Sequence, residues 1–408
     1  MNSTGTYTIL PLHWGSRHLW ISDWIEIFTL GFAPLIAHIL SGAPQPSHLC
    51  QSRPKWHDRL CTFNPTSILW RYAAITDRRI RAKTWSSMDI AASNALFWTS
   101  RGWDGSEAMV VRSRPYARCL PKKENVEIFS LEMLKTVIVV LQGIQALAGI
   151  LGNFTSTGNY TTMDTVSGLF IPIAMCGLLR LCAALWLTDD FTFMAENSTF
   201  LKSLPNDLNK FDIQWSVDSL VDEHGGYLCR RSPTPLRAWG SRIFRAFYIS
   251  IFLGLWGLTF LFITPWVGTF GWVGIWTTTS WMLGLFYITI LTPLIAVFVF
   301  YFVQGPITST IIPCISTWWY KAYSIFITAF LVVLVTIASI ETRKTVCGKY
   351  TSLAAQYGDP CATGNIQLLN ITTPSIKFGL TQDLGEGGEF VKVNFTGICL
   401  GILGSSNR

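Results

Sequence analysis

Long apolar segments are the feature that most limits what this chain can fold into. Several runs of 18 or more residues carry few or no charges, and a helix of that length crosses a hydrocarbon core of roughly 30 Å. With 50% hydrophobic and only 13% charged residues, the 408-residue chain has the composition of a membrane protein rather than of soluble domains. We therefore expect an all-α polytopic membrane protein with about six transmembrane helices.

Hydropathy divides the chain into six expected spans and the segments between them. Pro293 interrupts the fifth span, so we interpret it as a kinked helix. The preceding interfacial segment carries Trp266, Trp272, Trp276 and Trp281, which suit an aromatic belt. The expected order is an N-terminal segment 1–18, span 19–40, loop 41–129, span 130–151, loop 152–165, span 166–187, loop 188–242, span 243–263, interfacial loop 264–280, span 281–303, loop 304–321, span 322–340 and tail 341–408.

Charge in the loops predicts the orientation of the spans. Between Ser41 and Glu127, fourteen Lys and Arg stand against seven Asp and Glu, whereas 152–165 contains no Lys or Arg. Basic residues near helix ends resist translocation, so the charged loops are expected in the cytoplasm and both termini outside. A cleaved signal peptide at the first span is the alternative, and it would reverse every later helix.

Glycosylation sequons test this orientation independently. Asn153, Asn159, Asn370 and Asn394 each begin an Asn-x-Thr sequon on the side predicted to be outside, as Asn2 does. Asn197 begins a sequon on the opposite side. We therefore expect a glycosylated, multi-pass protein of the secretory route, in the plasma membrane or an endomembrane.

The ten cysteines are spread over several environments, which argues against one disulfide framework or one metal site. Cys347 and Cys361 lie in the expected outer tail and are the predicted disulfide, although Cys399 could pair with either. Polar residues alternate with Leu, Ile and Val in this tail, which predicts a small β-rich lobe. No metal ligand pattern and no cofactor motif is recognisable.

Ionisable residues within or beside the expected spans are candidates for a functional site, because burying a charge in hydrocarbon is costly. Glu26 and His38 lie in the first span and Arg180 in the third, and Asp189-Asp190 follows it directly. The aspartate pair weakly resembles the acidic pair of prenyl-transferring enzymes. A proton or cation path is one interpretation of Glu26 and His38, and a structural ion pair or snorkelling is the favoured interpretation of Arg180.

The loop 41–129 is long enough for a small cytoplasmic subdomain. Its stretch 85–98 is mostly apolar and lies between basic clusters at 78–81 and 112–123. Such a segment either lies on an anionic lipid leaflet or packs as a structural helix, and the sequence leaves both readings open. Nucleic acid is not an expected partner, and the oligomeric state cannot be read from the sequence.

This first third of the chain also resembles a known group. The segment Ile25 to His38, the element Phe63-Asn-Pro-Thr-Ser67 leading to Trp70-Arg71, and Met109-Val-Val-Arg112 resemble elements of uncharacterised multi-span membrane proteins of filamentous fungi. Asn64 and the stretch Trp103-Asp-Gly-Ser106 depart from that pattern. The resemblance implies kinship without a mechanism.

Two classes of function follow from these observations. The favoured one is a non-catalytic integral membrane protein with a transport, channel-like or membrane-organising role. The alternative is a membrane-embedded enzyme acting on a lipid or terpenoid substrate, with Glu26, His38, Arg180, Asp189 and Asp190 as its site. Convergence of those side chains would favour the enzyme, and their dispersal would favour a structural role.

Overall fold

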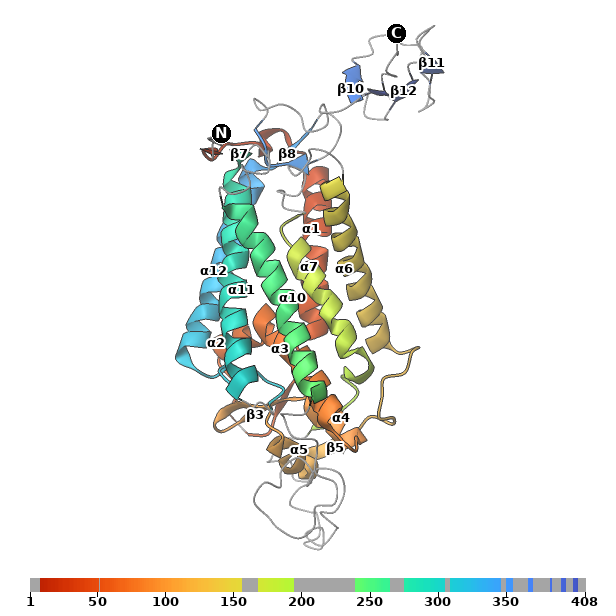
Figure 1. The fold of residues 1–408 in the computed structure, drawn as a ribbon, viewed down its shortest axis with the longest axis vertical. Helices are drawn as coiled ribbons and strands as arrows, with labels where there is room; N and C mark the ends of the chain where they lie inside the picture. Colours follow the sequence, from red (N-terminus) through yellow and green to blue (C-terminus); the bar gives the residue numbers. More distant parts are fainter. Residues whose placement is uncertain are drawn as a thin grey trace, which may run out of the picture.

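Five long helices frame the described part of the molecule in the computed structural model (Figure 1). Each contains a window long and apolar enough to cross a membrane, which confirms the expectation of an all-α polytopic protein. They are α1 (Ile21–Gly42), α6 (Leu131–Thr155), α10 (Trp239–Ile263), α11 (Thr278–Gln304) and α12 (Trp318–Glu341). The structure describes residues 8–50, 52–155, 168–193, 239–264, 275–304, 309–345, 350–354 and the strands at 366–369, 382–383, 390–393 and 399–402.

The third expected span, 166–187, is not one continuous helix. It consists of α7 (Ile171–Gly177) followed by the 3-10 turns η6 (Leu178–Cys182) and η7 (Ala184–Trp186). The segment runs antiparallel to α6, because Arg180 Nε donates to Thr136 Oγ1 (2.9 Å) and the Val126 amide donates to the Leu185 carbonyl (2.8 Å). Tighter turns of this kind mid-helix are typical of strained or functional segments.

The helices form two groups. The first group is α1, α6 and α7 with η6, and the second group is α10, α11 and α12. In the half of the bundle nearer the chain termini, here called the terminal half, the groups touch directly. Phe170 and Ile173 of the first group share an apolar cluster with Phe286 and Leu334 of the second, and the Tyr287 hydroxyl donates to the Leu169 carbonyl.

In the opposite half, a further helix separates the two groups. This helix, α3 (Pro65–Arg81), belongs to the segment expected as a cytoplasmic loop, yet it packs against α10, α11 and η6 inside the bundle (Figure 1). We call this end of the bundle the α3 half. Within the segment expected as a cytoplasmic subdomain, α3 is thus the part that packs among the long helices.

Just before α3, α2 (Trp56–Leu60) and η2 (Cys61–Phe63) pack against α12. Most of the rest of 41–129 forms a small layer beneath the bundle (Figure 1). It contains α4 (Ser87–Asn94), α5 (Ala108–Arg112), η3 (Arg114–Tyr116) and a sheet in which β2 (Pro46–His48) pairs parallel with β3 (Leu96–Thr99) and β3 pairs antiparallel with β4 (Gly102–Asp104). In the same layer β5 (Ala117–Cys119) pairs with β6 (Thr192–Phe193).

The apolar stretch 85–98 lies inside this layer. Met88, Ala91 and Phe97 are buried in one cluster with Val110 and Phe191. These side chains are packed within the layer, as the reading of 85–98 as a structural helix expects.

Exposed aromatic side chains mark both ends of the bundle. Trp14 and Trp20 are exposed at the terminal end, and Trp56, Trp239 and Trp318 at the other. Aromatic rings at these two levels are typical of the two membrane interfaces. Of the tryptophans expected to form the belt, Trp266 and Trp272 lie outside the described residues, whereas Trp276 lies in β7 (Ile275–Trp276), which pairs with β1 (Thr8–Ile9).

The C-terminal tail contains strands, as the sequence predicts. A hairpin of β8 (Arg343–Lys344) and β9 (Tyr350–Thr351) follows α12, and a sheet of order β10-β13-β12-β11 follows it. Its strands are β10 (Ile366–Leu369), β11 (Gln382–Asp383), β12 (Phe390–Val393) and β13 (Cys399–Ile402). Cys347, Cys361, Asn159, Asn370 and Asn394 lie outside the described residues, and Asn153 lies in the last turns of α6.

Candidate functional site

The helix α3 begins and ends at clear sequence signals. Asn64 caps it, because its Oδ1 accepts from the Thr66 amide (2.9 Å), and Pro65 occupies the first helical position, where no amide hydrogen is needed. Arg78, Arg79 and Arg81 lie in the last turn, where positive charge suits the helix dipole.

Aromatic side chains fix α3 between the two groups. Trp70 is fully buried, with its ring centroid 5.2 Å from that of Phe298 and 5.5 Å from that of Phe302. The Tyr248 hydroxyl of α10 donates to the Leu69 carbonyl (2.8 Å). Burying one large aromatic side chain contributes roughly 3–5 kcal/mol by the cost of its truncation, so this contact is a main anchor of α3.

A buried ion network holds the C-terminal end of α3. Asp77 accepts from Arg245 Nη2 of α10 (2.8 Å), from Arg81 Nε (3.0 Å) and from the Ser241 hydroxyl, and Arg81 Nη2 donates to Glu107 (2.7 Å). Each of the charged side chains is less than a tenth exposed. Removing one member would leave the others as uncompensated buried charges, which is strongly destabilising.

Two arginines meet the C-terminal end of α1. Arg71 Nη1 of α3 donates to the Gly42 carbonyl (2.8 Å), and Arg180 Nη1 of η6 donates to the Ser41 carbonyl. The last carbonyls of a helix have no partner within the helix, and cations near them are favourable. Both guanidinium groups therefore join α1 to α3 and to η6.

Charges of the first group complete this cluster. Arg180 Nη2 lies 3.9 Å from Glu132, and Lys135 contacts both Glu132 (2.6 Å) and Asp189 (3.1 Å). His38 is buried with its ring edge-on to Tyr72, at 6.4 Å between centroids, and neither of its nitrogens has a hydrogen-bond partner among the described residues.

The candidate residues predicted from the sequence thus separate into two places. His38, Arg180 and Asp189 gather in the α3 half, whereas Asp190 is exposed beside them. Glu26 lies twelve residues before His38 in α1, about 18 Å away along the helix, and accepts from the Tyr350 hydroxyl (2.8 Å). The five side chains do not converge in one pocket.

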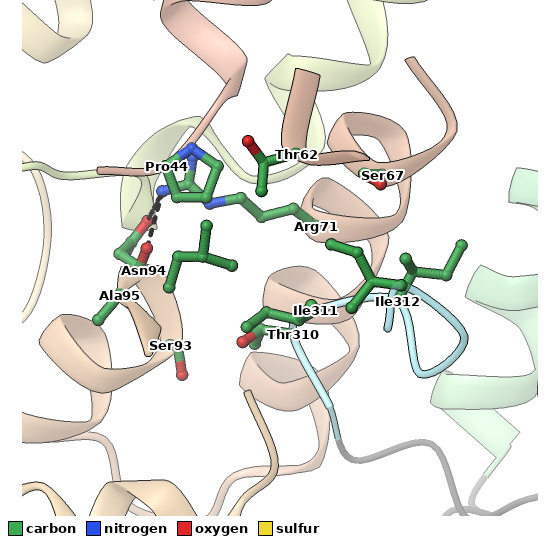
Figure 2. A pocket seen from close by; sticks show the side chains of 12 residues that line it. Pro44, Thr62, Ser67, Arg71, Ser93, Asn94, Ala95, Thr310, Ile311 and Ile312 are labelled. Carbon is green, nitrogen blue, oxygen red and sulfur yellow. Dashed lines mark hydrogen bonds between the residues drawn. The ribbon is translucent and has the colours of Figure 1, made fainter. Parts of the chain in front are cut away.

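A small cavity lies beside Arg71 (Figure 2). It has a volume of about 20 Å³, and its lining includes Ser67 and Arg71 of α3, Ser93 and Asn94 of α4, and Thr310 before α12. A cavity of that size holds about one water molecule and is far smaller than the pocket of a drug-sized ligand. Arg71 crosses the cavity to Asn94, where Nη2 donates to the amide oxygen (3.0 Å).

Burial shifts the acidity of the α3 arginines. Removal from water lowers the pKa of Arg71, against which the negative charge of Asp189 acts to raise it. The same cause lowers the pKa of Arg78 to about 10, although Glu107 opposes the shift. Both side chains remain cationic at neutral pH.

Several residues of this site were not singled out from the sequence. Arg71, Glu132, Asp77 and Asn94 lie in segments expected as loops or at a span boundary. Arg245 is different, because it lies inside the expected span 243–263. A charged residue within a span is a candidate for a functional site, and this rule, which identified Arg180, applies equally to Arg245. The dipeptide Asn64-Pro65 was a usable signal for the start of α3.

The described ranges contain no set of metal ligands, because no three His, Cys, Asp or Glu side chains come together there. Cys50, Cys61, Cys119, Cys176, Cys182 and Cys314 are free thiols. In comparisons with known proteins, no family model, no curated protein and no solved structure matches the chain.

Proposed function

We propose that this chain is a non-catalytic integral membrane protein that moves a small polar solute across its membrane along α3 and η6. The observation that carries the proposal is the meeting of α3, which is not one of the five long apolar helices, with the interrupted segment α7 and η6 around the buried guanidinium groups of Arg71 and Arg180.

The physical argument concerns where a membrane protein tolerates interrupted helices. Irregular backbone at membrane depth is stable only where protein covers it or where it lines a polar cavity. In many transporters, discontinuous helices build the solute site in this way. Here the interrupted segment places Arg180 beside Thr136 and Glu132, and the neighbouring α3 places Ser67 and Arg71 in the lining of the cavity.

The position of α3 indicates how such a path would be closed. The two helix groups touch directly in the terminal half, through Phe286, Leu334 and the Tyr287 contact to Leu169, and only α3 separates them at the other end. A small movement of α3 relative to the first group would open the α3 half without breaking the apolar contact. In this proposal α3 is the gate.

Orientation is part of the proposal. The α3 half carries the Arg-rich and Lys-rich segment 41–129, so we propose that it faces the cytoplasm and that both termini face outside. Protease protection of tags at residue 60 and at the C-terminus, together with gel shifts of sequon variants, tests this orientation.

Cysteine accessibility tests the solute path without knowledge of the solute. In a chain whose ten cysteines are replaced by serine, Ser67→Cys and Ser93→Cys should react with membrane-impermeant thiosulfonates applied from the α3 side. Ala73→Cys is the control, because Ala73 is fully buried in α3 without lining the cavity and should not react. A folded protein in which neither Ser67→Cys nor Ser93→Cys reacts from either side would refute the path.

An anionic lipid surface is the partner that we propose for the connector 118–131. Figure 1 shows this connector running out beside the start of α6, and its exposed side chains include Arg118, Lys122, Ile128 and Phe129. Cations beside exposed apolar side chains at a helix end fit the anionic leaflet. In nanodiscs, anionic lipid should raise the melting temperature less for Lys122→Gln than for the natural protein. Arg112 is exposed in α5, and Arg112→Gln should leave this rise unchanged.

The enzymatic alternative draws less support from the geometry. It needs Glu26, His38, Arg180 and the Asp189-Asp190 pair around one substrate, and Glu26 lies at the other end of α1. Glu26→Gln should therefore leave solute movement intact, while Arg180→Gln should impair it.

A further inference from the structure

The basic cluster at the end of α3 has one member outside the buried ion network. Arg78 and Arg81 are both less than a tenth exposed, and each donates to a partner in the layer beneath the bundle. Arg79 differs, because it is only partly buried and makes no hydrogen bond or ion pair with any residue that the structure describes. Its positive charge is therefore free to meet a ligand.

Two tryptophan rings hold the Arg79 guanidinium group in place. Its Cζ atom lies 5.9 Å from the ring centroid of Trp85 and 5.8 Å from that of Trp186. A guanidinium group over an aromatic face is attracted by the ring and keeps its N–H groups for other partners. The Nε atom is enclosed without a hydrogen-bond partner, whereas the two Nη atoms are open to the surface. The side chain is thus positioned in advance with unused donors at its tip.

The acidic side chains of the elements that flank Arg79 do not neutralise it. Asp89 of α4 accepts from the Ser86 amide (2.8 Å), and Asp189 pairs with Lys135 (3.1 Å). Asp190 is exposed to water and forms no ion pair within the described residues. The sequence of α10 contains no acidic residue.

Further positive charge lies at this end of the bundle. Lys83 follows α3 by two positions, and Arg242 lies in the first turn of α10, with its Cζ atom 5.9 Å from the ring centroid of Trp239. Both cations are exposed. The surface around Arg79 is therefore positive and favours an anionic ligand.

The same end of α3 lies at the level of a membrane interface. A Cβ atom at Gly240 would lie 3.4 Å from Ile80 Cγ2, so Ile80 lies beside the start of α10, where Trp239 is exposed. Ile80 is exposed as well, and so are Leu181 of η6 and Leu185 of η7. Cations beside exposed apolar side chains and tryptophan are typical of a surface that meets lipid headgroups and the first part of their chains.

We propose that the Arg79 guanidinium group, held between Trp85 and Trp186, binds the phosphate group of one anionic phospholipid. A guanidinium group presents paired donors that match two phosphate oxygens, and the exposed apolar side chains beside it cover the upper part of the lipid chains. This is a fixed position for a single lipid, unlike the extended lipid surface proposed for the connector 118–131. It does not rest on the proposed solute path.

Retention of lipid by the full-length protein in detergent is the test. In native mass spectrometry with added phosphatidylserine, the natural protein should keep one tightly bound lipid. Arg79→Gln should weaken the apparent affinity for this lipid by at least about tenfold. Arg112→Gln removes an exposed arginine of α5 and should leave the affinity unchanged. Equal affinity in Arg79→Gln and the natural protein, or equal retention of phosphatidylcholine, would overturn the proposal.

Inorganic phosphate separates the two sources of a phosphate group. At equal ionic strength, inorganic phosphate alone should leave the melting temperature in detergent unchanged, whereas phosphatidylserine should raise it. A rise with inorganic phosphate that Arg79→Gln abolishes would assign the site to a free anion and overturn the lipid.

A labelling measurement on the natural sequence covers the case in which Arg79→Gln does not fold. A phosphatidylserine probe with a photoreactive group close to its headgroup should label peptides that contain Ile80 or Leu185 more strongly than a phosphatidylcholine probe with the same chains. Equal labelling by the two probes would overturn the proposal. None of these outcomes depends on the reactivity of Ser67→Cys or Ser93→Cys, so the lipid site and the solute path can fail separately.

Discussion

The two halves of the bundle hold the two helix groups together in different ways. In the terminal half, side chains such as Ile27, Phe286 and Leu334 join the two helix groups mainly through apolar contact. In the α3 half, an inserted helix joins them, and it brings five charged side chains into the bundle with it. Separating an apolar contact opens a void and exposes apolar surface, whereas separating the ion network breaks particular ion pairs.

Because of this difference, we expect the two ends to respond differently when the helix groups move apart. A close-packed apolar contact is rigid, because any opening exposes side chains that have no alternative partners. A polar contact can exchange its hydrogen bonds for water. In the proposed function, the terminal half is therefore the fixed part and the α3 half is the part that moves.

Loss of Asp77 is expected to have the largest effect. Asp77→Asn leaves the buried cations Arg81 and Arg245 without their shared carboxylate, so we expect a destabilisation of about 3–5 kcal/mol. Thermal unfolding in detergent, followed by tryptophan fluorescence, measures it. Asp190→Asn is exposed and should change stability by less than about 0.5 kcal/mol. If Asp77→Asn melts like the natural protein, the α3 half does not depend on its charges.

Close packing of the first group is the next target. A Cβ atom at Gly143 would lie 2.7 Å from Leu178 Cγ and 2.9 Å from the Ala174 carbonyl oxygen, so Gly143→Ala should cost about 1–3 kcal/mol. At Gly254 of α10 nothing lies within 4 Å, and Gly254→Ala should be neutral or stabilise by up to about 1 kcal/mol. Parallel melting curves compare the two variants. Equal effects would mean that α6 and η6 do not pack as described.

The smallest expected effect is a pH dependence in the layer beneath the bundle. Burial, together with the nearby Arg59 and Arg53, lowers the pKa of His48 below its ordinary 6.5. The unfolded chain therefore binds a proton first as pH falls through 6.5, and stability declines on the acidic side. Above that pH both states are neutral at this position and His48 contributes no pH dependence.

Melting temperatures measured between about pH 7.5 and pH 5 check this, because that range includes the ordinary histidine pKa. His48→Asn should flatten the acidic decline, and His18→Asn, whose ring is exposed, should leave it as it is. A steeper decline in His48→Asn would show that the imidazole is protonated in the folded state.

The sequence predicts the long helices well because their signal is local. The windows of α10, α11 and α12 are uniformly apolar, and their bounds agree with the expected spans to within four residues. Average hydropathy cannot detect the 3-10 turns after Gly177, since Leu178 and Leu179 are as apolar as any helix requires. The turn geometry depends on contacts with α6, which lies earlier in the chain.

The candidate site was harder to predict for a different reason. A segment with Arg71, Asp77, Arg78, Arg79 and Arg81 resembles a solvated loop to any hydropathy measure, and its burial depends on partners far away in sequence. Arg180 was identified because it lies in an apolar run. Its partners Glu132 and Ser41 were not, because pairing across helices has no local sequence signature.

The distance in sequence between Asp77 and Arg245 has a consequence for how the protein is made. The two residues are 168 positions apart, and at ordinary rates of synthesis the second leaves the ribosome roughly ten seconds or more after the first. Until then Asp77 lacks its partner on α10, and α3 lacks the aromatic side chains of α10 and α11 against which it packs. We therefore expect α3 to dock into the bundle only after these later helices have been made.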